Sequence, residues 1–220
     1  FGNAIHDTCE KMMTEGLEQK GPFFQLKFKE ILENLPETAN KDPKLVIPMQ
    51  DQGPLILEEI FPAMEEHFGD YEVLEAEEDL MEMIQDFSCE DKNKFKGFID
   101  LVIKTPDDKI HIIDWKTCSW GWDARKKADP MITYQLTFYK HFWAKKHNVD
   151  PKMIETHFAL LKRTAKNNRV EIFRVTSGPR KTENALKFLE KAIYNIEKKN
   201  FIKNRLACCK CEFHKTEHCP

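Results

Sequence analysis

The sequence lacks any run of about 18 apolar residues, the length needed to cross the hydrocarbon core of a bilayer as a helix, so no transmembrane helix is predicted. It also lacks internal repeats and low-complexity tracts, which argues against repeat architectures and long disordered segments. No secretory signal peptide is recognisable. The chain opens at Phe1 and Gly2, inside an expected helix and without a methionine, so we expect further residues upstream.

A secreted disulfide framework is also missing, because the seven cysteines are odd in number and unevenly placed. This usage is typical of a reducing compartment, and we expect a cytoplasmic protein with no membrane partner. The 220 residues are 41% hydrophobic and 32% charged. They are enough for one soluble domain with a sizeable core, or for a core with a small appendage.

The charge is unevenly distributed along the chain. Residues 1–100 contain 9 Lys and Arg against 24 Asp and Glu, a net charge of −15, whereas residues 101–220 contain 25 against 13, a net of +12. Two solvated faces of opposite sign would explain this. A basic surface for a polyanion in the C-terminal half would explain it equally well.

Residues 95–104 and 110–116 alternate or run apolar like strands, with a turn over residues 106–109 between them. Such a hairpin would bring Asp100 close to Asp114, and Lys116 lies two residues further on the same strand face. Two carboxylates and one ammonium at a sheet edge can hold a divalent metal and polarise a water molecule. This pattern suggests metal-dependent hydrolysis of phosphodiesters.

The remaining periodicity predicts helices over residues 1–20, 22–35, 55–68, 131–146 and 179–199, and strands over residues 71–77, 80–87, 156–163 and 170–175. Residues 36–54 are rich in Pro, Asp, Asn and Gln and predict a surface loop. Pro130 is well placed to begin a helix. Glu77 belongs to an acidic cluster that is typical of a solvated face, but it could also be a metal-site carboxylate at a strand end.

Residues 118–127 predict a loop that combines aromatic and cationic side chains: Trp120, Trp122, Arg125, Lys126 and Lys127. Such a mixture suits stacking on bases and pairing with phosphates. Tryptophans that pack the loop against the core would be an equally good explanation.

The tail places four cysteines and two histidines within twelve residues, which packing alone explains poorly. Cys208 and Cys211 have the spacing with which two thiolates bind one metal ion. Zinc could be completed by Cys219 with His214 or His218, whereas an iron–sulfur cluster would need a fourth cysteine from elsewhere, such as Cys9 or an upstream residue. The alternative is a group of reduced thiols without a metal.

Five motifs in the chain resemble, in order, those of the RecB-like branch of the PD-(D/E)XK nuclease superfamily. They are Gly-x-x-x-His-x-x-x-Glu at Gly2, His6 and Glu10, Gly-x-x-Asp at Gly97 and Asp100, Asp-x-Lys-Thr at Asp114, Lys116 and Thr117, Gln-x-x-x-Tyr at Gln135 and Tyr139, and a cysteine trio at Cys208, Cys211 and Cys219. The family's fourth cysteine usually lies upstream of the histidine helix, outside this sequence. The spacing from Cys211 to Cys219 is also longer than usual.

The resemblance implies an α/β fold with a restriction-endonuclease-like core, in which helices flank a central mixed sheet. It implies a nuclease domain over residues 1–205, with a helical N-terminal part and a loop-and-helix insertion over residues 36–70. Residues 206–220 would form a metal-binding Cys/His-rich tail.

By the same resemblance, His6, Asp100, Asp114 and the backbone carbonyl of Trp115 would ligate Mg²⁺ or Mn²⁺. Lys116 would orient the nucleophilic water. The resemblance also assigns Gln135 and Tyr139 to the catalytic site, includes Glu10 through its motif, and gives the tail cysteines a [4Fe-4S] cluster.

The resemblance implies a DNA exonuclease that acts on single strands or duplex ends in recombination, repair or phage DNA processing. A helicase or another recombination protein would be its partner, and the host cytoplasm its location if it is phage-encoded. The alternatives are a CRISPR-adaptation-type or structure-selective endonuclease, a catalytically silent DNA-binding subunit, and a structural metal-binding module.

Overall fold

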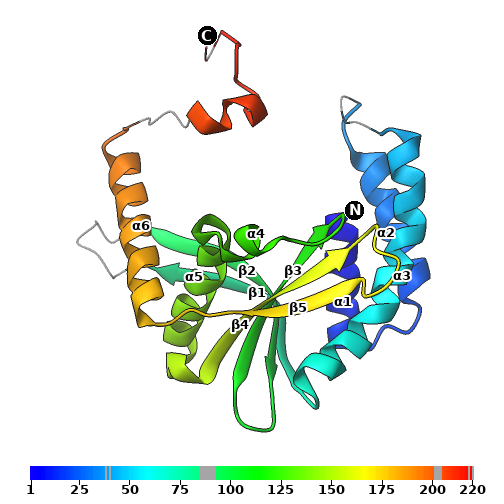
Figure 1. Ribbon diagram of the computed structural model, residues 1–220, viewed down its shortest axis with the longest axis horizontal. Coiled ribbons are helices and arrows are strands. Elements are labelled where there is room, and N and C mark those ends of the chain that lie inside the picture. Colours follow the sequence, from blue (N-terminus) through cyan, green and yellow to red (C-terminus); the bar gives the residue numbers. More distant parts are fainter. Residues whose placement is uncertain (38, 40, 85–92, 201–204, 218, 220) are drawn as a thin grey trace.

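The computed structural model describes residues 1–220 except 38, 40, 85–92, 201–204, 218 and 220. It has the expected α/β architecture, a five-stranded mixed sheet with helices packed on both faces (Figure 1). Within the described residues, no helix is both long enough and apolar enough to cross a membrane.

The helices and strands follow one another along the chain as α1 (Gly2–Glu15), α2 (Lys20–Asn34), α3 (Pro43–Phe68), β1 (Glu72–Met83), β2 (Lys94–Lys104), β3 (Ile110–Cys118), α4 (Ala124–Ala128), α5 (Pro130–His147), β4 (Ile154–Lys162), β5 (Val170–Val175) and α6 (Pro179–Glu197). Short 3₁₀ helices, Pro151–Met153 and Arg205–Lys210, precede β4 and follow α6.

The strands lie in the sheet in the order of the chain, β1-β2-β3-β4-β5. Neighbours are antiparallel except β3 and β4, which are parallel. Parallel neighbours need a crossover connection, and α4 and α5 supply it. The predicted hairpin is therefore β2 and β3, and the expected mixed sheet is confirmed.

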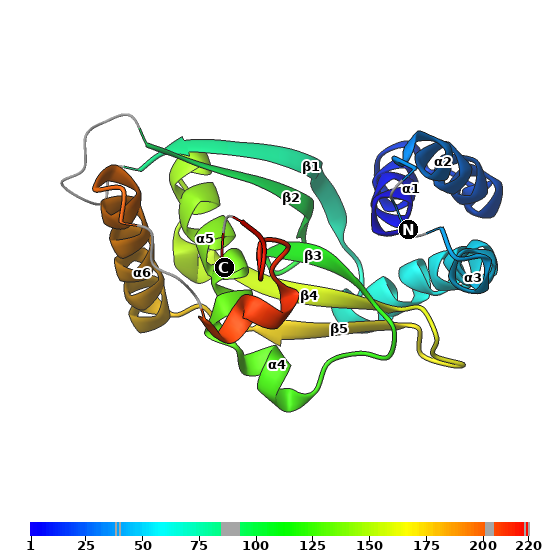
Figure 2. The same ribbon diagram turned by 90° about the horizontal axis from the view of Figure 1, so that it is seen from above.

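Each face of the sheet carries its own apolar core. Figure 2 shows α1, α2 and α3 on one side of the sheet and α5 and α6 on the other. On one face, α1, α2 and α3 pack on side chains that include Ile113 and Trp115 of β3. On the other face, α5 and α6 pack on side chains that include Ile112 of β3 and Phe158 of β4. The alternation along β3 follows from the two-residue repeat of a strand.

The prediction of a loop over residues 36–54 was wrong from Pro43 onward, where α3 begins. Asp42 caps this helix by accepting a hydrogen bond from the Lys44 amide (2.9 Å), and Pro43 fits the first turn because no amide is needed there. Three further prolines lie inside α3. Prolines inside a helix normally oppose it, but here the buried apolar face of α3 against α2 and the sheet outweighs that tendency.

Two other predicted boundaries need correction. A single strand, β1, runs over Glu72–Met83 in place of two strands over residues 71–77 and 80–87, and residues 85–87 lie outside the described part. Within the predicted loop over residues 118–127, α4 begins at Ala124 because the Asp123 carboxylate caps it through the Lys126 amide (2.7 Å). The predicted helix start at Pro130 is confirmed, with Asp129 as its cap.

Candidate active site

The candidate site lies where the sheet splits. Strands β2 and β3 pair only from Leu101 opposite Ile113 to Lys104 opposite Ile110. Beyond that point β2 continues along β1, and β3 continues along β4. The Asp100 carboxylate accepts a 2.6 Å hydrogen bond from the Trp115 amide, which lies beyond the last residue pair of β2 and β3. This hydrogen bond holds the carboxylate at the point where the two strands separate.

Helix α1 brings the first imidazole to this carboxylate. Its buried face, which includes Ile5 and Cys9, packs in the core, and His6 beside that face remains partly exposed. His6 Nδ1 lies 3.2 Å from Asp100 Oδ1, and the pKa of the imidazole is raised by the Asp100 carboxylate against the opposing effect of burial. A Cβ at Gly2 would lie 3.3 Å from Thr117 Oγ1, so the glycine allows α1 to approach the end of β3 closely.

Glu77 approaches the same point from β1. The pairing of Ala76 with Leu101 and of Glu78 with Ile99 places Glu77 opposite Asp100. Its φ of 53° is unusual for a residue other than glycine. Ligand atoms of His6, Glu77 and Asp100 all lie within 4.8 Å of one another. Burial and the Asp100 charge raise the Glu77 pKa, as expected when carboxylates crowd together without a cation.

Asp114 is almost fully buried and lies beside this group, but outside the three residues whose ligand atoms lie within 4.8 Å. Lys116 Nζ is 2.6 Å from Asp114 Oδ2 and forms an ion pair with it, so the ammonium offsets part of the charge of this buried carboxylate. Burial and the neighbouring Asp100 charge raise the pKa of Asp114 to about 7.

These features fit a divalent cation, which the resemblance to the nuclease superfamily implies. Ligand groups that crowd together and carboxylates with raised pKa values are the groups that a cation would stabilise. Carboxylate oxygens suit Mg²⁺, and a single imidazole shifts the preference toward Mn²⁺.

Helix α5 and strand β2 form one wall of the site. Gln135 Nε2 donates to Tyr139 Oη at 3.0 Å, so this predicted pair is a hydrogen-bonded unit one helical turn long. The Tyr139 ring packs directly on Gly97, where a Cβ would lie only 2.6 Å from Cε1. Burial raises the pKa of Tyr139 to about 12, so the phenol stays protonated and can donate a hydrogen bond.

The aromatic and cationic segment after β3 divides into exposed and packed side chains. Trp120 is 75% exposed, and Arg125 and Lys126 are also exposed. Trp122 instead packs against Phe158 and Phe173, with Lys126 Nζ lying 4.6 Å from its ring centroid. Lys127 forms an ion pair with Glu171. Packing therefore explains Trp122, whereas DNA contacts by the exposed Trp120, Arg125 and Lys126 stay a prediction.

The other candidates lie outside this cluster. Glu10 is one helical turn beyond His6 and is not among the three grouped ligands. In the described part of the tail, Cys208, Cys211 and Cys219 do not belong to any group of three ligand atoms within 4.8 Å. His218 is outside the described residues, and the side chain of Cys209 is not described.

Two residues of the arrangement had weak sequence signals. Glu77 is one of four neighbouring acidic residues, so its place in the cluster follows only from the pairing of β1 with β2. Thr117 belongs to a motif, but its position next to Gly2, where an added Cβ would lie 3.3 Å from Thr117 Oγ1, depends on the packing of α1 against β3.

Comparisons with known proteins bear on the fold and the family of the chain. No curated protein matches the sequence significantly. A solved structure from Eubacterium rectale, described as a candidate exonuclease, has 14% sequence identity over 96% of this chain and 73% of its own, with a TM-score of 0.56. The structure of SSO0001 has 15% identity over 87% of this chain and 93% of its own, with a TM-score of 0.44. A family model described as the PD-(D/E)XK nuclease superfamily matches residues 1–219, and the chain belongs to this superfamily.

Proposed function

We propose that the protein is a deoxyribonuclease that depends on Mg²⁺ or Mn²⁺ and degrades DNA from ends. The observation that carries the proposal is the meeting of His6, Glu77 and Asp100 at the split of the sheet, next to the buried pair Asp114–Lys116. The structure from Eubacterium rectale, described as a candidate exonuclease, supports the fold on which the proposal rests.

His6, Asp100, Asp114 and the Trp115 carbonyl would hold the cation, with Glu77 as a further carboxylate ligand. When bound, the cation lowers the pKa of water and offsets charge at the phosphate. The Asp100 carboxylate holds the Asp114–Trp115 peptide in one orientation through the 2.6 Å hydrogen bond from the Trp115 amide. This contact ties the Asp100 ligand of β2 to the segment of β3 that carries the Asp114 ligand.

Lys116 would act on the substrate directly. Its ammonium group has three donors and is about 30% exposed, so it can hold a water molecule and a phosphate oxygen at once. Asp114 fixes the ammonium from the buried side. Tyr139 and Gln135 donate hydrogen bonds toward the scissile strand, and Trp120, Arg125 and Lys126 bind DNA beyond it, by stacking and by pairing with phosphates.

The test is a nuclease assay on end-labelled linear DNA and on circular single-stranded DNA with Mg²⁺ or Mn²⁺. We expect linear DNA to be degraded and circular DNA to survive. Asp114→Asn and Lys116→Met should each lose about two to three orders of magnitude in rate, the usual cost of removing a transition-state electrostatic contact. Circular dichroism would show that both variants are folded.

Lys104→Met and Asp108→Asn are matched controls. Lys104 and Asp108 form a 2.6 Å ion pair at the exposed turn between the same two strands, away from the split, so their loss should leave the rate unchanged. Cleavage of circular DNA would replace the exonuclease with an endonuclease of the CRISPR-adaptation or structure-selective type. DNA binding without cleavage would indicate the catalytically silent subunit. Unchanged activity of Asp114→Asn would overturn the catalytic assignment.

We also propose that Cys208, Cys211 and Cys219 bind a [4Fe-4S] cluster or Zn²⁺, since two thiolates separated by two residues can bind one ion. Elemental analysis with a visible absorption spectrum distinguishes iron from zinc. A purified chain free of both metals would contradict this part of the proposal.

A further inference from the structure

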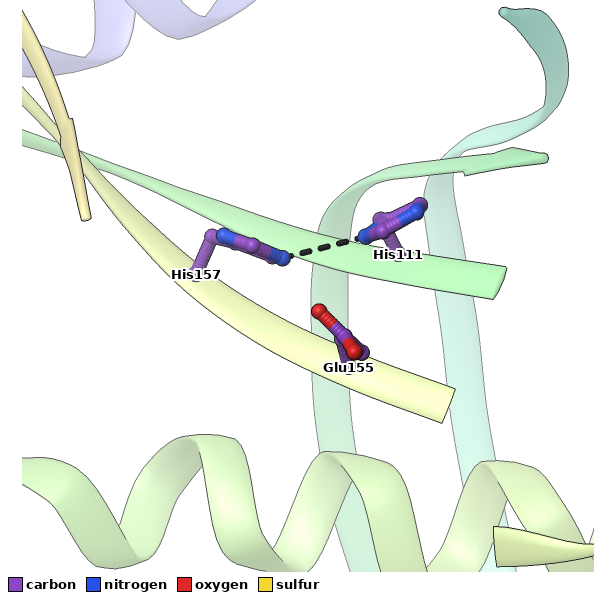
Figure 3. A group of neighbouring side chains, drawn as sticks. All are labelled: His111, Glu155 and His157. Carbon is purple, nitrogen blue, oxygen red and sulfur yellow. Dashed lines mark hydrogen bonds between the residues drawn. The ribbon is translucent and has the colours of Figure 1, made fainter. Parts of the chain in front are cut away.

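A second group of metal-ligand side chains lies at the start of β3 and β4, and Figure 3 shows it. His111 belongs to β3, and Glu155 and His157 belong to β4. The parallel register pairs His111 with Glu155 and Ile113 with His157. Since side chains alternate along a strand, all three lie on one face of the sheet. Their ligand atoms lie within 4.8 Å of one another.

This group is separate from the candidate active site. His111 lies on the same face of β3 as Ile113 and Trp115, which pack toward α1, α2 and α3. Asp114 lies on the same face of β3 as Ile112, which packs toward α5 on the other side of the sheet. No motif of the nuclease site includes the residues of the second group.

The hydrogen bonds determine which ring nitrogen of His111 carries the proton. The Thr105 hydroxyl has one proton and donates it to Asp107, so it accepts from His111 Nε2 at 3.1 Å. His111 Nδ1 therefore presents a lone pair, and this lone pair faces His157 Nε2 at 3.1 Å. An imidazole whose other nitrogen donates to an oxygen is the arrangement typical of a metal-binding histidine.

The two rings are spaced for one ion. Nitrogens bound to tetrahedral zinc at about 2.0–2.1 Å lie roughly 3.3 Å apart, close to the 3.1 Å between His111 Nδ1 and His157 Nε2. Both imidazoles are buried, and burial lowers the pKa of His157 to about 3, so its ring stays neutral. His157 Nδ1 has no hydrogen-bond partner among the described residues, so one buried ring nitrogen of the cluster is unsatisfied.

The carboxylate of Glu155 is the third ligand group, and two basic side chains outside the cluster hold it in place. Arg174 and Lys109 contact it at 3.1 and 3.6 Å, both through the same oxygen, Oε1. Figure 3 shows the carboxylate beside the gap between the two rings. Phe68 covers the rings, with its centroid 5.0 Å from each.

We propose that His111, Glu155 and His157 form a second metal site that binds Zn²⁺ or a similar transition-metal ion. Two imidazoles and one carboxylate are a known zinc donor set, and imidazole favours this class over Mg²⁺. The ion replaces the hydrogen bond between the two rings and ties β3 to β4. His67, whose ring centroid is 5.3 Å from that of His157, flanks the site at the end of α3.

The test measures zinc per chain by elemental analysis after equilibrium dialysis against buffered Zn²⁺. The parent is the full chain with all four tail cysteines replaced by serine, so that thiolates do not contribute. We expect His111→Gln and His157→Gln each to lose one zinc equivalent relative to this parent. Zinc bound at the nuclease site contributes equally to the parent and the variants, so it cancels in the difference.

Two further variants separate ligation from folding. Thr105→Val removes the oxygen that orients His111 and should weaken zinc binding about 10–100-fold while keeping the side-chain shape. His147→Gln alters an imidazole that contacts Glu78 elsewhere and should keep the full zinc content. Zinc should also raise the melting temperature of the parent by more than that of folded His157→Gln.

Equal zinc content in the parent and in the folded His111→Gln and His157→Gln variants would overturn the proposal. If these two variants do not fold, unchanged zinc affinity in Thr105→Val would overturn it instead. Because nuclease activity is not the readout, failure of this site and failure of the proposed function are distinguishable.

Discussion

Asp114→Asn should stabilise the metal-free protein at high pH although it inactivates the enzyme. Burial and the Asp100 charge raise the Asp114 pKa from 3.8 to about 7, so ionising this carboxyl is unfavourable in the folded chain. Between pH 4 and 7 the unfolded chain has released the proton and the folded chain has kept it. Folding stability therefore falls as pH rises through this window, and stays lowered above it.

The size of the effect follows from the shift. Each pKa unit corresponds to 1.36 kcal/mol, so the raised pKa of Asp114 lowers the unfolding free energy of the wild type by at most about 4 kcal/mol at pH 8. The asparagine variant cannot ionise and avoids this penalty. The difference in unfolding free energy between variant and wild type should be small near pH 4 and should increasingly favour the variant up to pH 8.

Urea unfolding of both proteins at several pH values, with EDTA present, measures this difference. Titration of groups remote from Asp114 cancels, because the proteins differ at one position; the Asp114 charge also raises the pKa of His6, so this imidazole contributes to the difference as well. Asp108→Asn changes an exposed carboxylate of the same strand connection and should show no such trend. A variant that is less stable than wild type at pH 8, or a difference that does not vary with pH, would refute the reasoning. Mg²⁺ should stabilise the wild type more than Asp114→Asn, because the cation offsets the same charge.

Two further predictions concern packing and DNA binding. Gly53→Ala should lower the unfolding free energy by about 1–3 kcal/mol, because the added Cβ would lie 2.1 Å from the Phe24 ring. Gly21→Ala, whose added Cβ would have its first neighbour at 3.5 Å, should be neutral or stabilising. Thermal melts of both variants check this, and equal melting temperatures would contradict it. Trp120→Ala should weaken single-stranded DNA binding by about 1–3 kcal/mol at unchanged stability, because this ring is exposed. Trp122→Ala should destabilise the fold, because that ring packs on the sheet. Fluorescence anisotropy measures the first effect and thermal melts measure the second, and the opposite pattern would show that the two roles are exchanged.

The parts of the fold that depend on local signals could be predicted from the sequence. The β2–β3 hairpin follows from strand alternation around a turn, and the start of α5 from the Asp129 cap with Pro130. The start of α3 could not be predicted in this way, because prolines that usually break helices are tolerated there by long-range packing. Composition describes a segment by itself, whereas this helix is stabilised by its neighbours.

The residues of the candidate site likewise fall into those that a local motif identifies and those that long-range packing brings in. His6, Asp100, Asp114 and Lys116 could be named because a motif fixes their residue types and spacing. Glu77 joins them through the register of β1 and β2, which no single segment encodes. The approach of Tyr139 to Gly97 likewise joins two motifs into one packed unit, and it explains physically why the motif has a glycine there.

The two metal sites differ in a way that bears on how they would coexist. The group at the split is rich in carboxylates and partly open, whereas the second group has two buried imidazoles. Zinc binds most sites more tightly than Mg²⁺, and imidazole ligands favour it further, so the second site competes with the carboxylate site for zinc. Its rings are neutral and need not lose a proton to bind the ion. In the parent with serine in place of the tail cysteines, limiting zinc should therefore leave Mg²⁺-dependent cleavage unchanged, and it should inhibit cleavage when His157→Gln is added. Equal inhibition of both proteins would place the tighter zinc site at the split of the sheet.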